Sequence, residues 1–228
     1  MDLSEHDKIG NDPLEITHFA LKPEQMTQDP MMLQEKLASR IITTDSFGSI
    51  KKVCGVDVSY KDNVASTCAV IVDRKTLQMI ESVNAKTKVN QPYQPGLLFL
   101  REAEPAFSAL HLLQNDYDLL LVDGNGQLHP RKCGLACHLG LSLDKPTIGV
   151  AKSLLCGKIK NNRVILDSKI MGAVIKNRKN VFVSVGHKIG LRSATKIVQE
   201  LIKKDQWLPE PLRLADHYSK TWKNKNVV

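Results

Sequence analysis

Hydrophobic and polar residues alternate along residues 53–89 in a way that predicts three consecutive strands. β-Branched residues are frequent from Val53 to Tyr60, from Val64 to Asp73 and from Leu77 to about Val89. The connections at 61–63 and 73–76 are short and polar, as turns are. Because short turns join antiparallel neighbours, the pattern predicts a three-stranded antiparallel meander.

Helical spacing and short apolar runs alternate on both sides of this meander. Asp29-Pro30 is typical of a helix start, and apolar residues follow at helical spacing to about Ile42. Further predicted elements are a helix from Leu97 to about Asn115 interrupted at Pro105, a strand at 118–123, a helix at 131–141, strands at 146–151 and 181–185, and a helix at 194–202. Residues 153–178 have a weaker pattern, for which we expect strands around polar turns. Together these elements predict an α/β fold with a mixed β-sheet flanked by helices.

The chain length of 228 residues suits one domain with short appendages. Residues 1–28 are polar and show neither helical nor strand periodicity, so we expect them to form an N-terminal extension. We expect a single domain at 29–216 and a basic C-terminal tail at 217–228. The longest apolar runs, such as Leu119 to Val122, are far shorter than the roughly 18–20 residues that span a bilayer, which excludes a membrane protein. The acidic N-terminus has no secretion signal, so we expect a cytoplasmic protein, acting as a monomer.

Charge is distributed unevenly along the chain. Residues 1–150 contain 15 Lys and Arg against 19 Asp and Glu, whereas residues 151–228 contain 17 against 5. Such a basic segment is expected of a protein that binds a polyanion, because each cation placed on a phosphate releases counterions. A basic surface that serves solubility alone is the alternative.

The five cysteines do not predict a disulfide framework, because their number is odd and a cytoplasmic chain keeps them reduced. We interpret them as small buried hydrophobic residues. Cys133 and Cys137 lie near His129 and His138, but this spacing is not that of a structural zinc site.

Three carboxylates stand out by their positions in predicted elements. Asp57 lies in the middle of an apolar strand, where an ionised carboxylate is costly unless a positive group meets it. Asp123 ends a buried strand, where α/β sheets commonly place ligands, and Glu102 lies early in the long helix. Each alone could be a turn, capping or surface residue. If they converge, a divalent cation must offset their repulsion, and an oxygen-only ligand set suits Mg²⁺ or Mn²⁺.

Several basic and polar groups follow the predicted strands and could serve phosphodiester cleavage. These are His129-Pro130-Arg131, Lys152 and His187. Taken by itself, His187 could instead be a helix-capping residue. A lysine and histidines beside metal-bound carboxylates can neutralise developing charge and orient water. Phosphate-binding loops of nucleoside triphosphate and dinucleotide sites are missing from the sequence, and so is a serine-hydrolase motif.

Five segments in order resemble the motifs of the endonuclease V family. They are residues 53–59, 92–102, 122–131, 146–152 and 186–187, and the resemblance extends over about residues 30–215. It implies a ribonuclease-H-like fold and an Mg²⁺-dependent endonuclease, with Mn²⁺ as a substitute. It also implies cleavage at the second phosphodiester bond 3′ to a deaminated purine, chiefly hypoxanthine, leaving a 3′-hydroxyl and a 5′-phosphate.

Position by position, the resemblance implies that Asp57, Glu102 and Asp123 bind the metal. It also implies that Lys152 faces the scissile phosphate. His187 matches a family histidine near the metal, and His129 and Arg131 match a motif that we expect to face the substrate.

The segment Pro92-Tyr93-Gln94-Pro95, here called the wedge segment, matches the loop with which the family enters the helix beside the lesion. Prolines stiffen a loop, and a tyrosine ring can stack in the gap left by an extruded base, although core packing is an alternative for Tyr93. Gln94 departs from the apolar residue that is commoner in the family. The resemblance places the extruded base near Leu98, Gly124 and Gly149, where glycines let the backbone approach it.

The sequence therefore predicts a nuclease that initiates DNA repair at deoxyinosine. The alternative within the same chemistry is an endoribonuclease that acts on inosine in RNA. The wedge segment and His129-Pro130-Arg131 resemble the DNA-directed prokaryotic members more than the animal ones, which favours DNA. A nucleic-acid-binding module without catalysis is a third interpretation, but acidic residues in a cleft would not help a pure binder.

Overall fold

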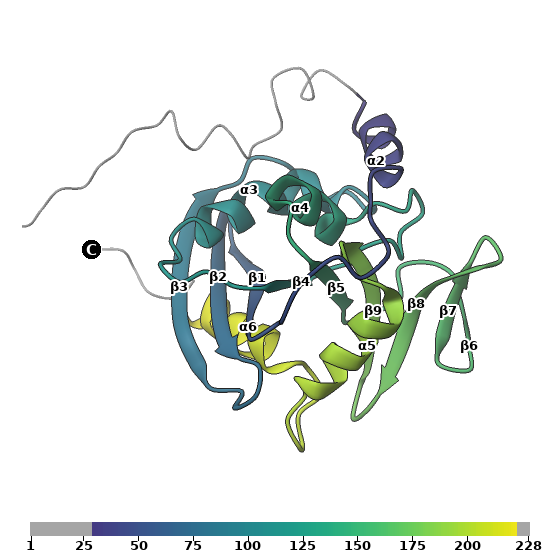
Figure 1. Ribbon diagram of the computed structural model, residues 1–228. Coiled ribbons are helices and arrows are strands. Elements are labelled where there is room, and N and C mark those ends of the chain that lie inside the picture. The colour runs from purple at the N-terminus through teal and green to yellow at the C-terminus, as the bar shows by residue number, and fades with distance from the viewer. Residues whose placement is uncertain (1–28, 223–228) are drawn as a thin grey trace, which may run out of the picture.

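The computed structural model describes residues 29–222 (Figure 1). The predicted N-terminal extension and the last six residues of the predicted tail lie outside this range. The described helices and strands are α2 (Pro30–Ala38), β1 (Lys52–Lys61), β2 (Val64–Asp73), β3 (Met79–Lys88), α3 (Leu98–Leu110), β4 (Leu119–Asp123), α4 (Leu135–Leu143), β5 (Thr147–Ala151), β6 (Lys158–Lys160), β7 (Arg163–Leu166), β8 (Lys169–Lys176), β9 (Asn180–His187), α5 (Leu191–Glu200) and α6 (Glu210–Trp222).

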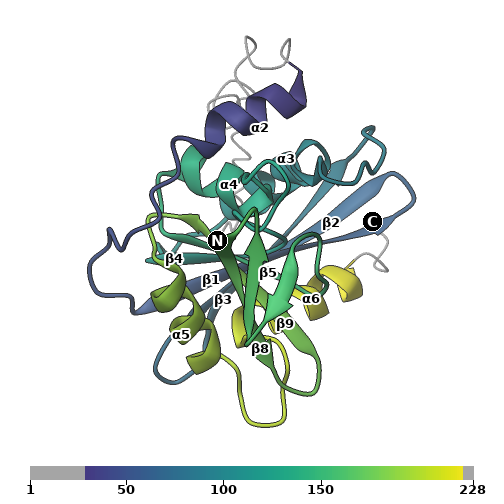
Figure 2. The same ribbon diagram turned by 90° about the vertical axis from the view of Figure 1, so that its right-hand side faces the viewer.

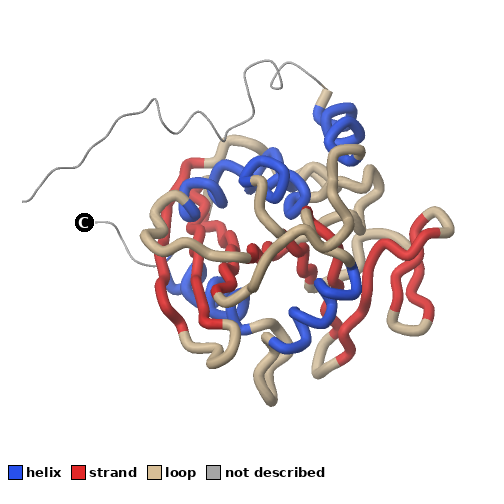
Figure 3. Tube along the Cα trace, viewed as in Figure 1, coloured by secondary structure: helices blue, strands red, loops and turns tan. Residues whose placement is uncertain are grey.

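A single mixed sheet organises the described part of the chain. Nine strands follow the order β3-β2-β1-β4-β5-β9-β8-β7-β6. The meander β1-β2-β3 is antiparallel as predicted, β4 and β5 run parallel to β1, and β9 returns antiparallel beside β5. The predicted α/β class with a mixed sheet is confirmed, including strands at residues 153–178 (Figure 3).

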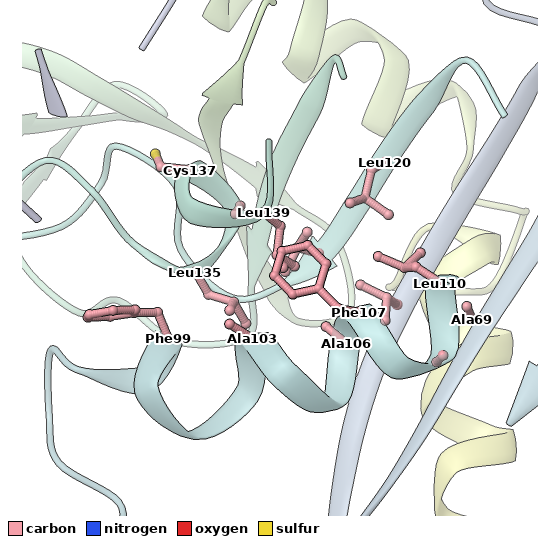
Figure 4. Packing of buried hydrophobic residues seen from close by; sticks show 14 of the residues in the cluster. Ala69, Phe99, Ala103, Ala106, Phe107, Leu110, Leu120, Leu135, Cys137 and Leu139 are labelled. Carbon is pink, nitrogen blue, oxygen red and sulfur yellow. The ribbon is translucent and has the colours of Figure 1, made fainter. Parts of the chain in front are cut away.

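Helices cover both faces of the central strands (Figure 2). Alternate residues of β4 point to opposite faces, so Leu120 packs in a core beneath α3 and α4, whereas Leu119 and Leu121 pack in a core above α5 and α6. In the first core Phe107 of α3 lies against Leu139 of α4 (Figure 4). Burial of each such side chain contributes about 1.5–3 kcal/mol, which fixes α3 and α4 relative to the sheet.

Two predicted boundaries are wrong. Helix α2 ends at Ala38, because Ser39 caps it and the chain turns toward the sheet. The second correction concerns the start of the predicted C-terminal tail, since α6 is a helix of 13 residues that crosses the expected boundary at 216. Its buried face holds Leu212, Ala215 and Ser219, and two of these are too small or too polar to give a strong hydrophobic signal.

Helix α6 lies directly on β1 at Gly55. A Cβ atom at Gly55 would be 2.5 Å from the carbonyl carbon of Pro211, which is closer than real Cβ contacts. The glycine therefore permits a helix-to-strand approach that brings α6 next to Asp57, two residues further along the same face of β1. None of the described helices is long and apolar enough to cross a membrane.

Candidate active site

A cavity of about 300 Å³ lies where β4 and β5 end, beside the middle of β1, and it is bordered by α3. Asp57 from β1, Asp123 from the end of β4 and Glu102 from α3 all line it, together with Lys152, which follows β5 directly. The structure thus brings together four residues that the sequence analysis selected from separate segments. Parallel strands place their carboxyl ends on one edge of a sheet, which explains the convergence.

The carboxylates gather around one lysine. Lys152 Nζ lies 2.5 Å from Asp123 Oδ2, 2.6 Å from Asp216 Oδ1 and 3.7 Å from Asp57 Oδ1. One oxygen from each aspartate lies within 4.8 Å of the others. Lys220 Nζ also lies 2.6 Å from Asp216 Oδ2, so two ammonium groups face three carboxylates, and Asp57 is only 5% exposed.

Helix α6 supplies two residues of this site that the sequence analysis missed. Asp216 binds Lys152, and Ser219 donates a hydrogen bond of 2.8 Å from Oγ to Asp57 Oδ2. Ser219 is fully buried, so the bond fixes one carboxylate oxygen of Asp57 and leaves the other toward Lys152. Their spacing of three residues on a helix face was the available signal.

Burial and mutual repulsion shift the acidities of these groups. Burial, followed by the interaction with Asp123, raises the pKa of Asp57 to about 9, although Lys152 and Ser219 oppose the shift. Burial alone would raise the pKa of Asp216, but hydrogen bonds from Lys152 and Lys220 lower it overall. Burial would lower the pKa of Lys152, but the surrounding carboxylates raise it, so the lysine stays charged.

Glu102 reaches the cavity from the opposite face of the sheet. Tyr60 donates a hydrogen bond of 3.3 Å from its hydroxyl to Glu102 Oε1, and burial followed by repulsion from Asp123 raises the pKa of Glu102 to about 8. Among the described residues, the close acidic group consists of Asp57, Asp123 and Asp216, and Glu102 lies outside it. The close acidic group thus differs from the predicted set in two members, because Asp216 belongs to it and Glu102 does not.

The acidic group fits a divalent cation by its chemistry. All its donors are carboxylate oxygens, which suit hard ions such as Mg²⁺ or Mn²⁺. Burial and then the interaction with Asp123 raise the pKa of Asp57, and a cation would offset the repulsion between these two carboxylates.

The wedge segment lies at the rim of the cavity with its residues exposed. Tyr93 lines the cavity and is 62% exposed, so the core-packing alternative is wrong. Arg101 holds the preceding residue through a 2.6 Å hydrogen bond from its guanidinium to the carbonyl of Gln91. Pro92, Gln94 and Pro95 are exposed beside Tyr93.

The motif after β4 supports this rim from inside the protein. His129 is buried and lines the cavity, and its Nε2 lies 3.1 Å from the carbonyl oxygen of Gly96. Burial, followed by the charge of Arg131, lowers the pKa of His129 to about 4, so this ring is neutral. Arg131 was expected to face substrate, but its guanidinium donates to Gly96 and Gln34.

Two of the three residues predicted to surround the extruded base line the cavity. Leu98 and Gly124 line the cavity. Gly149 does not, because the backbone of Gly124 and Gly126 packs against it and covers it. Its role in the structure is to let that loop approach β5 closely.

The position predicted for His187 is wrong. His187 pairs with Thr147 at the start of β5, whereas Lys152 follows the other end of that strand. The separation of five residues between Thr147 and Lys152 corresponds to about 16 Å along the strand. His187 accepts a hydrogen bond of 3.3 Å from the backbone of Ile42 and faces Asp144, not the acidic group.

Comparisons with known proteins agree on one family. A sequence model of the family Endonuclease V matches residues 35–217. Endonuclease V of Thermofilum pendens is 42% identical over 203 residues, covering 85% of this chain and 88% of that protein.

Solved structures of the same family are similar across nearly the whole described domain. Endonuclease V of Streptomyces avermitilis has a TM-score of 0.79 and 32% identity, covering 90% of this chain and 93% of that one. Endonuclease V of Ciona intestinalis, solved with DNA that contains an inosine followed by a ribo-adenosine, has a TM-score of 0.77 and 31% identity, covering 84% and 95% of the two chains.

Proposed function

The chain belongs to the endonuclease V family of nucleases, and from that premise we propose that it cleaves DNA at deoxyinosine to initiate repair. The proposed cut is at the second phosphodiester bond 3′ to the lesion and leaves a 3′-hydroxyl and a 5′-phosphate. The observation that carries the proposal is the group of Asp57, Asp123 and Asp216 around Lys152 at the edge of a cavity.

In the proposed mechanism, Asp57, Asp123 and Asp216 hold Mg²⁺, with Mn²⁺ as a substitute. The bound ion would supply charge neutralisation at the phosphate and acidify a coordinated water. Lys152 then faces the scissile phosphate, where its ammonium offsets the charge that develops during cleavage. Ser219 orients Asp57, and Glu102 faces the cavity from the α3 side.

Recognition of the lesion is assigned to the rim and the cavity. We propose that Tyr93 enters the base stack beside the lesion while the extruded hypoxanthine occupies the cavity near Leu98 and Gly124. The Ciona relative was solved with inosine-containing DNA, which supports inosine as the recognised base. The exposure of Tyr93 and the anchored ends of the wedge segment also support this role.

A basic surface next to the site suits the flanking nucleic-acid backbone. Residues 153–179 contain a single acidic residue and seven exposed cations: Lys158, Lys160, Arg163, Lys169, Lys176, Arg178 and Lys179. Sheet pairing runs from Ala151 through β9, β8 and β7 to β6, four strand spacings or about 19 Å from the end of β5. That distance corresponds to about five or six base pairs.

Inosine in RNA is the second candidate substrate. The ligand of the Ciona relative carries a ribo-adenosine directly after the inosine, so a ribose at that position is compatible with the family fold. A binding module without catalysis is disfavoured, because three buried or half-buried carboxylates would repel a phosphate backbone unless a cation were present.

Cleavage of matched end-labelled strands tests the proposal. One carries a single deoxyinosine in DNA and the other a single inosine in RNA, each with Mg²⁺ and with chelator. We expect an Mg²⁺-dependent nick one nucleotide beyond the deoxyinosine and slower cutting of RNA. Faster cutting of RNA would assign the protein to RNA metabolism, and no cutting of either strand would reject the nuclease activity.

A further inference from the structure

Gln34 is a buried amide on α2 that lines the cavity but does not belong to the acidic group. It is 2% exposed and lies between Leu33 and Leu37, whose side chains pack in the core. Its Nε2 donates a 2.7 Å hydrogen bond to the carbonyl of Cys133, and its Oε1 accepts a 2.6 Å hydrogen bond from Arg131 Nε. The amide therefore connects α2 to the loop after β4 with both of its functional atoms.

Arg131 passes this connection to the wedge segment. Its terminal NH2 group donates a 2.6 Å hydrogen bond to the carbonyl oxygen of Gly96, the residue that follows Pro95. His129 Nδ1 accepts from the backbone of Arg131 at 3.2 Å, which leaves the ring proton on Nε2, 3.1 Å from the same Gly96 oxygen. Two donors thus hold one carbonyl at the end of the wedge segment.

The conformation of Gly96 makes this anchoring specific. Gly96 has φ +77°, and a Cβ atom there would lie 2.9 Å from the Arg131 guanidinium. The close approach and the left-handed backbone both require glycine. Among the described ion pairs none involves Arg131, so its orientation depends on neutral partners, of which Gln34 is one.

We propose that Gln34 is a positioning residue that fixes the wedge segment through Arg131, so that α2 controls how the enzyme opens a duplex at inosine. This inference rests on the proposed function. Gln34 lies immediately before residue 35, where the match to the family model begins. Loss of Gln34 leaves Nε of the half-buried Arg131 and the Cys133 carbonyl without these partners and releases the Gly96 turn.

The test compares cleavage of duplex and single-stranded DNA that carries deoxyinosine. A wedge must separate stacked, paired bases in a duplex, whereas in a single strand the base is already accessible. Gln34→Leu should lower kcat/KM on the duplex by about tenfold, since a misplacement of about 1 Å can cost up to 100-fold. On the single strand kcat/KM should stay near the wild-type value.

Three further variants keep this test decisive. Gln34→Glu retains an acceptor for Arg131, through which the wedge segment is held, and should restore most of the duplex-to-single-strand ratio although it cannot donate to the Cys133 carbonyl. Leu201→Ala creates a cavity in the remote core of α5 and should lower thermal stability without changing the ratio. Combined with Tyr93→Ala, Gln34→Leu should cause no further loss on the duplex, because both act through the wedge segment.

Equal losses on both substrates, or the same ratio change in Leu201→Ala, would overturn the role of Gln34. Additive losses with Tyr93→Ala would also overturn it. Should Gln34→Leu not fold, Arg131→Gln removes the contact to Gly96 from the other side, and an unchanged ratio in that variant would reject the inference. Failure of the wild-type protein to cut deoxyinosine would instead reject the proposed function.

Discussion

Replacing Gly55 by alanine should damage the active site through the backbone alone. The added Cβ atom would lie 2.5 Å from the carbonyl carbon of Pro211 and 2.7 Å from its carbonyl oxygen, whereas ordinary contacts begin at 3.4 Å. Helix α6 must therefore retreat from β1 by roughly 1 Å. Two of the three obstructing atoms belong to the backbone and the third is Cβ of the rigid Pro211 ring, so no flexible side chain can absorb the shift.

This retreat has two expected consequences. Overpacking of this kind costs about 1–3 kcal/mol in the free energy of unfolding. The bonds from Ser219 to Asp57 at 2.8 Å and from Lys152 to Asp216 at 2.6 Å would lengthen beyond hydrogen-bonding range. A shift of about 1 Å at catalytic groups can cost up to 100-fold in rate, so cleavage should fall between about 10-fold and 100-fold.

Urea unfolding and the rate of deoxyinosine cleavage together measure the effect. Gly48→Ala is the matched control, because no heavy atom lies within 4 Å of the Cβ that it adds. The control should match the wild-type protein in cleavage. If Gly55→Ala retained wild-type stability and wild-type cleavage, the close seating of α6 on β1 and its importance to the site would be refuted.

Other changes test the site and the core separately. Asp57→Ala should abolish cleavage but keep binding to an inosine-containing strand, because it removes a metal ligand and leaves the exposed cations of residues 153–179 in place; gel-shift and cleavage assays on the same strand check this, and undiminished cutting would contradict it. Tyr93→Ala should reduce the preference for inosine over adenine in competition cleavage, and unchanged selectivity would argue against the wedge. Burial lowers the pKa of His138 from 6.5 to about 4. The unfolded chain therefore takes up a proton at this position more readily than the folded protein does between these two pH values. The free energy of unfolding should be unaffected by His138 above pH 6.5 and should decrease by about 3 kcal/mol as the pH falls to 4. His138→Leu should lose that pH dependence in unfolding titrations, and an equal dependence would show that His138 is not the cause.

Much of the fold and half of the site follow from local sequence patterns. The meander was predictable because β-branched strands and polar turns alternate over residues 52–88. Asp57 and Asp123 stood out because each is a charge in an apolar strand, and Lys152 because it follows one. Each of these residues can be recognised from its own segment of sequence. The parallel arrangement of the strands then brings them together in one site.

The rest depended on packing that the sequence pattern does not reveal. Helix α6 was missed because most of its residues are polar or charged, although its few apolar residues share one buried face, and Asp216 was lost with it. His187 was misplaced because the direction of β9 relative to β5 is fixed by tertiary pairing. Gln34 is a single polar residue on a buried helix face, and its partner Arg131 is 97 residues away in the chain.

A crystal structure with Mn²⁺ and an uncleaved deoxyinosine duplex would test the central claim most directly. Anomalous scattering locates the metal independently of the protein model. We expect a manganese peak bound by Asp57, Asp123 and Asp216, with the hypoxanthine base extruded into the cavity and Tyr93 in the stack that it leaves. A metal bound away from these three carboxylates, or a hypoxanthine base that remains stacked in the duplex, would contradict the assignment of this cavity as the cleavage site.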